Sequence, residues 1–196
     1  MEVNTLSVSQ NKTYNTLKPK LIKLWNCVHE ALDSYREYPD TTVHGPSTQA
    51  AIRNDLIFRN IVSEFDDDVP DCKPVLDRKS HLRFLAVGHN DLLLWFKKVS
   101  AQRVPSNYMT SHATDILSGG QIEMFPKASI IVVGYLLDGE ENRLKRLSFA
   151  PPSLGKPAWY FDIARVAKVS GMRGPQRINT RTQLVVTKGA EQIILL

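Results

Sequence analysis

The stretch Leu92–Phe96, written LLLWF, is apolar at every position and runs directly into Lys97 and Lys98. Successive residues of a strand point to opposite faces of a sheet, so an apolar run of this kind buries both faces. The stretch therefore predicts a central strand that is covered on both sides. The two lysines mark the end where this strand emerges into solvent.

Upstream of this strand the apolar residues recur at steps of three and four, which is typical of helices with one buried face. One such pattern runs from Leu17 to Tyr35 and is stopped by Pro39, with Pro19 tolerated in the first turn. A second pattern follows the turn at 45–46, with Ser47 as its expected N-cap. Residues 1–13 are polar and are predicted to form a flexible N-terminal arm.

Downstream of residue 82 the pattern becomes that of β-hairpins and short strands. We expect one helical turn at Ser111–Leu117, a bulge near Arg146, and a loop at 72–80. The expected strands are 82–87, 92–99, 129–137, 143–150, 158–163, 177–186 and 191–196. The predicted fold class is α+β, with two N-terminal helices packed on a mostly antiparallel sheet of about six to seven strands. Residues 14–196 would form a single domain, with a helical part at 14–68 and a β-rich basic part at 82–196.

The composition is that of an ordinary globular protein of one domain, with 196 residues of which 42% are hydrophobic. No apolar run reaches the roughly 20 residues that span a bilayer, and the N-terminus lacks the apolar core of a secretory signal. Cys27 and Cys72 are the two cysteines, too few for a disulfide framework. We therefore expect a cytoplasmic protein with reduced thiols and no membrane association.

The charge of the chain is unevenly distributed. Residues 1–70 carry 7 Lys and Arg against 10 Asp and Glu, residues 71–142 carry 8 against 8, and residues 143–196 carry 10 against 2. A basic final quarter indicates either a surface for an acidic partner or packing against the acidic N-terminal third. The basic and acidic regions of two copies of the chain could also pack against each other, so a homo-oligomer is a further alternative.

The basic part is the candidate binding region, for nucleic acid or for an acidic protein partner. Arg177 and Arg181 fall on one face of an expected strand, where alternate residues are about 7 Å apart, close to the phosphate spacing along one nucleic-acid strand. Arg173 lies in a loop without acids. The predicted contact residues are Lys97, Lys98, Lys145, Arg146, Lys168, Arg173, Arg177 and Arg181. The alternative is an ordinary solvated surface that carboxylates neutralise.

Catalytic signatures for phosphate cradles, zinc peptidases and serine hydrolases are missing from the sequence. We therefore expect a protein that is not an enzyme, with neither cofactor nor metal. The enzymatic alternative is a nuclease of the restriction-enzyme type, in which Asp71, Asp77 and Lys79 would hold Mg²⁺ and orient a water. The two acids are only six positions apart, which leaves too little chain for the strand and turn that such a site requires.

Several segments together resemble an uncharacterised bacterial family whose members are encoded on prophages and mobile islands. They are VHGPSTQAAIRND, LLLWFKKVS, QIEMFP and GYLLDGEENRLKRLSFAPPSLGKPAWYFDI, within residues 14–163. Members of the family tend to accompany a helix-turn-helix regulator and an ImmA/IrrE-like metallopeptidase. The resemblance implies a regulatory, toxin–antitoxin or phage-defence setting, and it assigns no residue a role.

Overall fold

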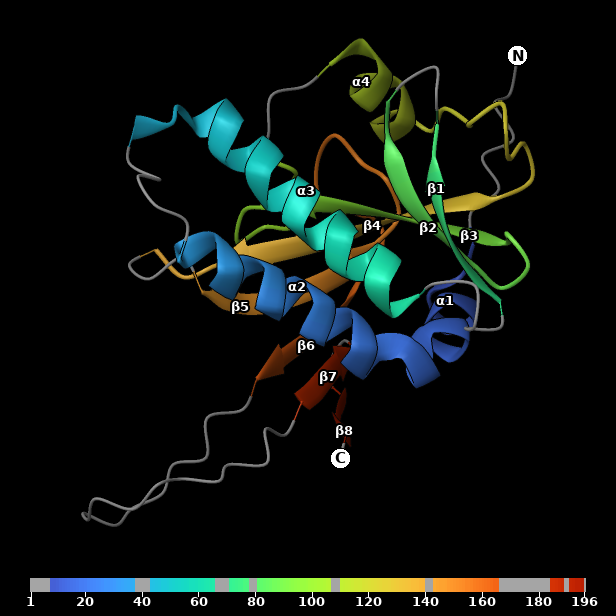
Figure 1. Cartoon of the computed structure of the whole chain (residues 1–196). Coiled ribbons are helices and arrows are strands. Elements are labelled where there is room, and N and C mark those ends of the chain that lie inside the picture. Colours follow the sequence, from blue (N-terminus) through green and yellow to red (C-terminus); the bar gives the residue numbers. More distant parts are fainter. Residues whose placement is uncertain are drawn as a thin grey trace.

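The computed structural model describes residues 8–37, 43–65, 71–77, 81–106, 110–139, 143–165, 184–188 and 191–195, and the structural statements below refer to these ranges. Helices lie across a twisted sheet, with α2 and α3 side by side in front of it (Figure 1). The helical elements are α1 (Gln10–Leu17), the 3-10 turn η1 (Lys18–Lys20), α2 (Leu21–Arg36), α3 (Pro46–Glu64) and α4 (Ser111–Leu117).

Within the described ranges the sheet has eight strands, in the order in which they follow along the chain. They are β1 (Cys72–Leu76), β2 (Arg83–Val87), β3 (Leu92–Lys98), β4 (Ser129–Leu137), β5 (Leu144–Ala150), β6 (Phe161–Arg165), β7 (Leu184–Lys188) and β8 (Glu191–Leu195). Neighbouring strands are antiparallel except for β3 and β4, which are parallel. The predicted class, α+β with N-terminal helices on a mostly antiparallel sheet, is confirmed.

The strand that was not expected is β1, because its sequence CKPVL was interpreted as part of a loop. Pro74 lacks a backbone N–H and is tolerated in a sheet mainly on an edge strand. β1 is such an edge strand, since among the described strands it pairs only with β2, with Pro74 opposite Leu85. The proline therefore indicated an edge position rather than the absence of a strand.

Both faces of the sheet are covered, as the apolar stretch of β3 predicts. Leu92, Leu94 and Phe96 belong to the larger core cluster, which the sheet shares with α1, α2 and α3. Leu93 and Trp95 belong to a second cluster on the opposite face, which α4 covers. The central, doubly covered strand is thereby confirmed, as is the short helix α4.

The first helix begins earlier than the sequence predicted. α1 starts at Gln10, inside the stretch 1–13 that was expected to be a flexible arm, and Ser9 caps it by accepting a hydrogen bond from the Lys12 N–H. Its sequence QNKTYNTL is polar overall, but Thr13, Tyr14 and Leu17 share one buried face. Three buried positions in two turns are too few to stand out as a periodic pattern.

The register of the β4–β5 pair contains the bulge predicted near Arg146. Leu136 lies opposite Arg146 and Leu137 lies opposite Leu144, so Lys145 is the extra residue. α3 begins two positions earlier than expected: its N-cap is Gly45, and Pro46 occupies the first turn, where proline is favoured. In the described residues no helix is both long and apolar enough to cross a membrane.

Candidate functional site

The ladder between β2 and β3 is short. It pairs Leu85–Val87 with Leu92–Leu94, although β3 continues to Lys98. β2 instead stays paired with β1 along its whole length. Beyond Leu94 the two strands therefore separate. On that edge, within the described ranges, β3 meets no strand until Val99 bridges to Pro105.

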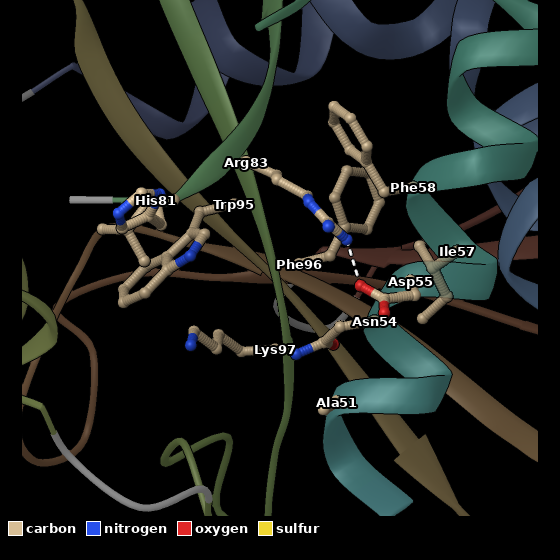
Figure 2. Close-up of a pocket in the computed structure, with 11 residues that line it drawn as sticks. Ala51, Asn54, Asp55, Ile57, Phe58, His81, Arg83, Trp95, Phe96 and Lys97 are labelled. Carbon is tan, nitrogen blue, oxygen red and sulfur yellow. Dashed lines mark hydrogen bonds and ion pairs between the residues drawn. The ribbon is translucent and has the colours of Figure 1, made fainter. Parts of the chain in front are cut away.

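Two adjoining cavities lie where β2 leaves β3. The first, about 240 Å³, is walled by α3, by the residues at the start of β2, and by Trp95, Phe96 and Lys97 of β3 (Figure 2). The second, about 520 Å³, is walled by the first part of α3, by Lys97 and Lys98, and by Ser106. They share Ala51, Asn54 and Lys97, so we treat them as one site and call it the α3–β3 cleft.

The two lysines of this cleft were predicted as contact residues, but they point to opposite faces of the sheet because they are consecutive in a strand. The Lys97 ammonium lies 4.2 Å from the centroid of the Trp95 ring, and burial lowers the pKa of Lys97 to about 8. Lys98 lies on the α3 side, where burial, followed by the positive charge of Arg53, lowers the pKa of its amine. Within the described residues neither ammonium group has a carboxylate partner.

Arg53 is a third cation of the cleft. It is 4% exposed, its guanidinium lies 4.1 Å from the centroid of the Tyr35 ring, and it donates a hydrogen bond to Gln49 Oε1 at 3.4 Å. The described lining of the second cavity thus carries three cations and no acid. The acid of the first cavity, Asp55, forms an ion pair with Arg83.

Hydrogen-bonding groups also face the cleft. The Val99 N–H donates to Tyr135 O of β4, whereas Lys98 O accepts from the Ser106 N–H on the opposite edge. Backbone groups of alternate strand residues point to the same edge, so the N–H and C=O of Phe96 point away from β4, toward the side of β3 where β2 departs and the first cavity lies. Asn54 extends toward the β3 backbone from α3 (Figure 2).

The other two described contact candidates, Lys145 and Arg146, are not part of the cleft. Lys145 is the exposed residue of the β5 bulge. Arg146 lies with its Nε 3.8 Å from Oδ1 of the buried Asp162 and donates from Nη2 to Ala101 O at 3.0 Å. Arg103 donates to the same carboxylate through both Nε and Nη2. Its guanidinium carbon lies 3.5 Å from the centroid of the Tyr160 ring. Arg146 is therefore part of an internal ion cluster rather than a contact surface.

The remaining predicted contact residues lie outside the described residues. They are Lys168, Arg173, Arg177 and Arg181. Whether these four cations gather on one surface stays a prediction.

The acids of the nuclease alternative are not brought together. Asp71 precedes β1 and pairs with His89 at 2.9 Å, whereas Asp77 follows the same strand at its other end. Six residue steps along an extended strand amount to about 20 Å, too far for two carboxylates to share one Mg²⁺. Lys79 lies outside the described residues. Among the described side chains no group of three His, Cys, Asp or Glu residues is placed to hold a metal ion.

The cleft residues that the sequence analysis missed are Arg53 and Asn54. A signal existed for Arg53, because it falls at a spacing of four from Ile57 and Ile61 on the buried face of α3. A cation on an apolar stripe indicates either a buried partner or a site. No such signal existed for Asn54, whose role depends on where β3 lies. Comparison of the chain with protein-family models, curated proteins and solved structures found no match.

Proposed function

We propose that this protein is a non-enzymatic nucleic-acid-binding protein that contacts the phosphate backbone at the α3–β3 cleft and through its basic C-terminal part. The observation that carries the proposal is the pair Lys97 and Lys98, two half-buried ammonium groups with no carboxylate partner among the described residues. Burial of a charge without a counter-ion is costly, and an incoming phosphate would offset that cost.

The position of the two lysines supports contact with an extended polyanion rather than with a small ion. The two lysines lie on opposite faces of β3, beside the edge that β2 leaves unpaired. A nucleic-acid strand that crosses this edge would contact both lysines. Nucleic acid supplies phosphates at regular intervals, and each contact releases condensed counterions. Binding of this kind needs no catalytic group and is steeply dependent on salt.

The C-terminal part is the second element of the proposal. Residues 143–196 carry 10 Lys and Arg against 2 Asp and Glu. Arg146 is committed to Asp162, so we assign backbone contacts to Arg173, Arg177 and Arg181. Charge reversal at these three positions is expected to weaken binding and to flatten its dependence on salt. The mobile-element setting that the family resemblance implies would make such binding regulatory.

The experiment that tests the proposal is fluorescence anisotropy with labelled single-stranded and double-stranded DNA and RNA over a series of salt concentrations. Wild type is compared with the Lys97→Gln/Lys98→Gln variant and with Lys127→Gln. Lys127 is an exposed lysine next to the opposite end of β4. In a plot of the logarithm of the association constant against the logarithm of the salt concentration, the slope of the double variant should be less steep than that of wild type by about 1.5. The slope of Lys127→Gln should match that of wild type.

Two outcomes decide against the proposal. Wild type that binds none of the four nucleic acids at low salt would remove it. If that protein instead bound polyglutamate with the same dependence on Lys97 and Lys98, the acidic protein partner would take its place. Glutamine is polar and only one atom shorter than lysine, and a thermal unfolding curve of each variant shows whether the fold is retained.

A further inference from the structure

We infer that the α3–β3 cleft holds one nucleotide, with its base in the first cavity against the edge of β3 and its phosphate in the second cavity at Lys98. The inference rests on the proposed function and deepens it, because contact with a phosphate backbone requires no cavity for a base, whereas binding of a nucleotide does. It depends on the different character of the two cavities and on their connection.

The first cavity suits a flat, partly polar ring. It lies between α3 and β3, has a volume of about 240 Å³, and is walled in part by Phe58 and Leu82. The Phe96 N–H and C=O point toward this side of β3, as a donor and an acceptor next to each other. The edges of nucleotide bases present donors and acceptors next to each other, and the N–H and C=O of one strand residue can pair with such an edge.

Asn54 provides a third, oriented group at the junction of the cavities. Its Oδ1 accepts a hydrogen bond from the Tyr135 hydroxyl at 3.3 Å. This bond occupies the amide oxygen and directs the NH₂ group elsewhere, as a donor on the cleft side. Tyr135 is fully buried, and burial raises the pKa of its hydroxyl, so the hydroxyl stays a donor. The amide is therefore held in place by the core.

The second cavity suits a phosphate. Lys98 and Arg53 supply positive charge, and its described lining contains no acid that would repel an anion. Charge-assisted hydrogen bonds from ammonium groups to phosphate are among the stronger polar contacts in proteins. The two cavities adjoin where they share Ala51, Asn54 and Lys97, and the side chain of Ala51 is only a methyl group. A nucleotide with its base in the first cavity and its phosphate in the second would pass this shared wall.

Two substitutions separate this inference from simple charge attraction. Ala51→Leu changes no charge, is well tolerated in a helix, and fills the junction of the cavities. Its control is Ser63→Leu, an exposed position 12 residues further along α3, about 18 Å away. Lys98→Gln removes the proposed phosphate contact, with Lys127→Gln as its control.

The test is isothermal titration calorimetry of the full chain with AMP, GMP, CMP, UMP, adenosine and inorganic phosphate. At least one nucleoside monophosphate should bind, and adenosine or phosphate alone should bind about tenfold more weakly or worse. Ala51→Leu and Lys98→Gln should each weaken that binding about tenfold or more, while both controls match wild type.

Three results would overturn the inference. If oligonucleotides bind and no monophosphate does, the cleft does not hold a nucleotide, although the proposed function stands. If phosphate binds as tightly as every nucleotide and Ala51→Leu has no effect, the cleft is an anion site without a base cavity. If neither nucleotides nor oligonucleotides bind, both proposals fail together.

Discussion

Val99 occupies the space in front of Gly134: a Cβ atom added at residue 134 would lie 2.7 Å from Val99 Cγ1. Real Cβ atoms do not approach other heavy atoms so closely, so the glycine is needed where the Val99 side chain lies against β4. Its neighbours in the sheet are Lys97 and Ser148. The packing at this point therefore affects the end of β3 that forms the cleft.

Gly134→Ala is expected to destabilise the protein by about 1–3 kcal/mol, because the new methyl group overpacks this contact. The measurement is the free energy of unfolding in urea. Gly155→Ala is the control, since a Cβ there meets nothing within 4 Å. Gly134→Ala combined with Val99→Ala should cost less than the sum of the two single changes. Additive costs would show that the two positions do not compete for space.

Asp162→Asn is expected to cost about 3–5 kcal/mol, because it leaves the arginines of the ion cluster without their buried carboxylate. Arg103 and Asp162 side chains are 17% and 8% exposed, so solvent cannot replace the lost interaction. The measurement is again the free energy of unfolding. Asp115→Asn, at an exposed position of α4, should change it by less than about 0.5 kcal/mol. Equal effects of the two changes would contradict a stabilising role for the cluster.

Lys97 should make stability depend on pH in the alkaline range. Its pKa is lowered to about 8 by burial, whereas that of a lysine in an unfolded chain is about 10.4. Between these values the unfolded chain binds the extra proton, so the free energy of unfolding rises with pH. The cost of burying the charge is present below the folded pKa and is relieved as pH increases.

The comparison is between wild type and Lys97→Met, which lacks the charge at every pH. From about pH 7 to about pH 10, wild type should gain stability relative to the variant. Lys127→Met, at an exposed position, controls for the loss of one positive charge. A difference between wild type and Lys97→Met that stays constant over this range would show that Lys97 is not desolvated.

Neither cysteine should react with a thiol reagent such as DTNB while the protein is folded. Cys27 is 1% exposed, and burial, followed by the negative charges of Glu64 and Glu30, raises its pKa to about 12. Burial also raises the pKa of Cys72, which is 8% exposed. Because thiolates are the reactive form, labelling should follow unfolding and reach two thiols per chain in urea. Rapid labelling of the folded protein would contradict the burial of both.

Local patterns predicted the elements whose residues form long, regular runs. The apolar stretch before Lys97 indicated a doubly covered strand, and the uneven spacing around Arg146 indicated a bulge. Local patterns failed where one residue pointed the wrong way, as Pro74 did for β1, or where too few residues were buried, as in α1.

The candidate site depends on long-range placement, which the sequence does not display. Lys97 and Lys98 were identified as contact residues, but the cleft around them exists because β2 follows β1 and departs from β3. The commitment of Arg146 to Asp162 likewise arises from the pairing of β5 with β6, in which Arg146 lies opposite Ala164. A charge pattern alone cannot distinguish a free arginine from one that a neighbouring strand neutralises.

The parallel contact between β3 and β4 divides the sheet into a three-stranded and a five-stranded antiparallel unit, joined along one seam. To close that seam the chain must first order the segment 99–128, which carries a loss of entropy before any contact compensates for it. We expect each antiparallel unit to form early and the pairing between β3 and β4 to form last. The refolding rate would then be set by the pairing of β3 with β4, and β3 is also the strand that carries Lys97 and Lys98.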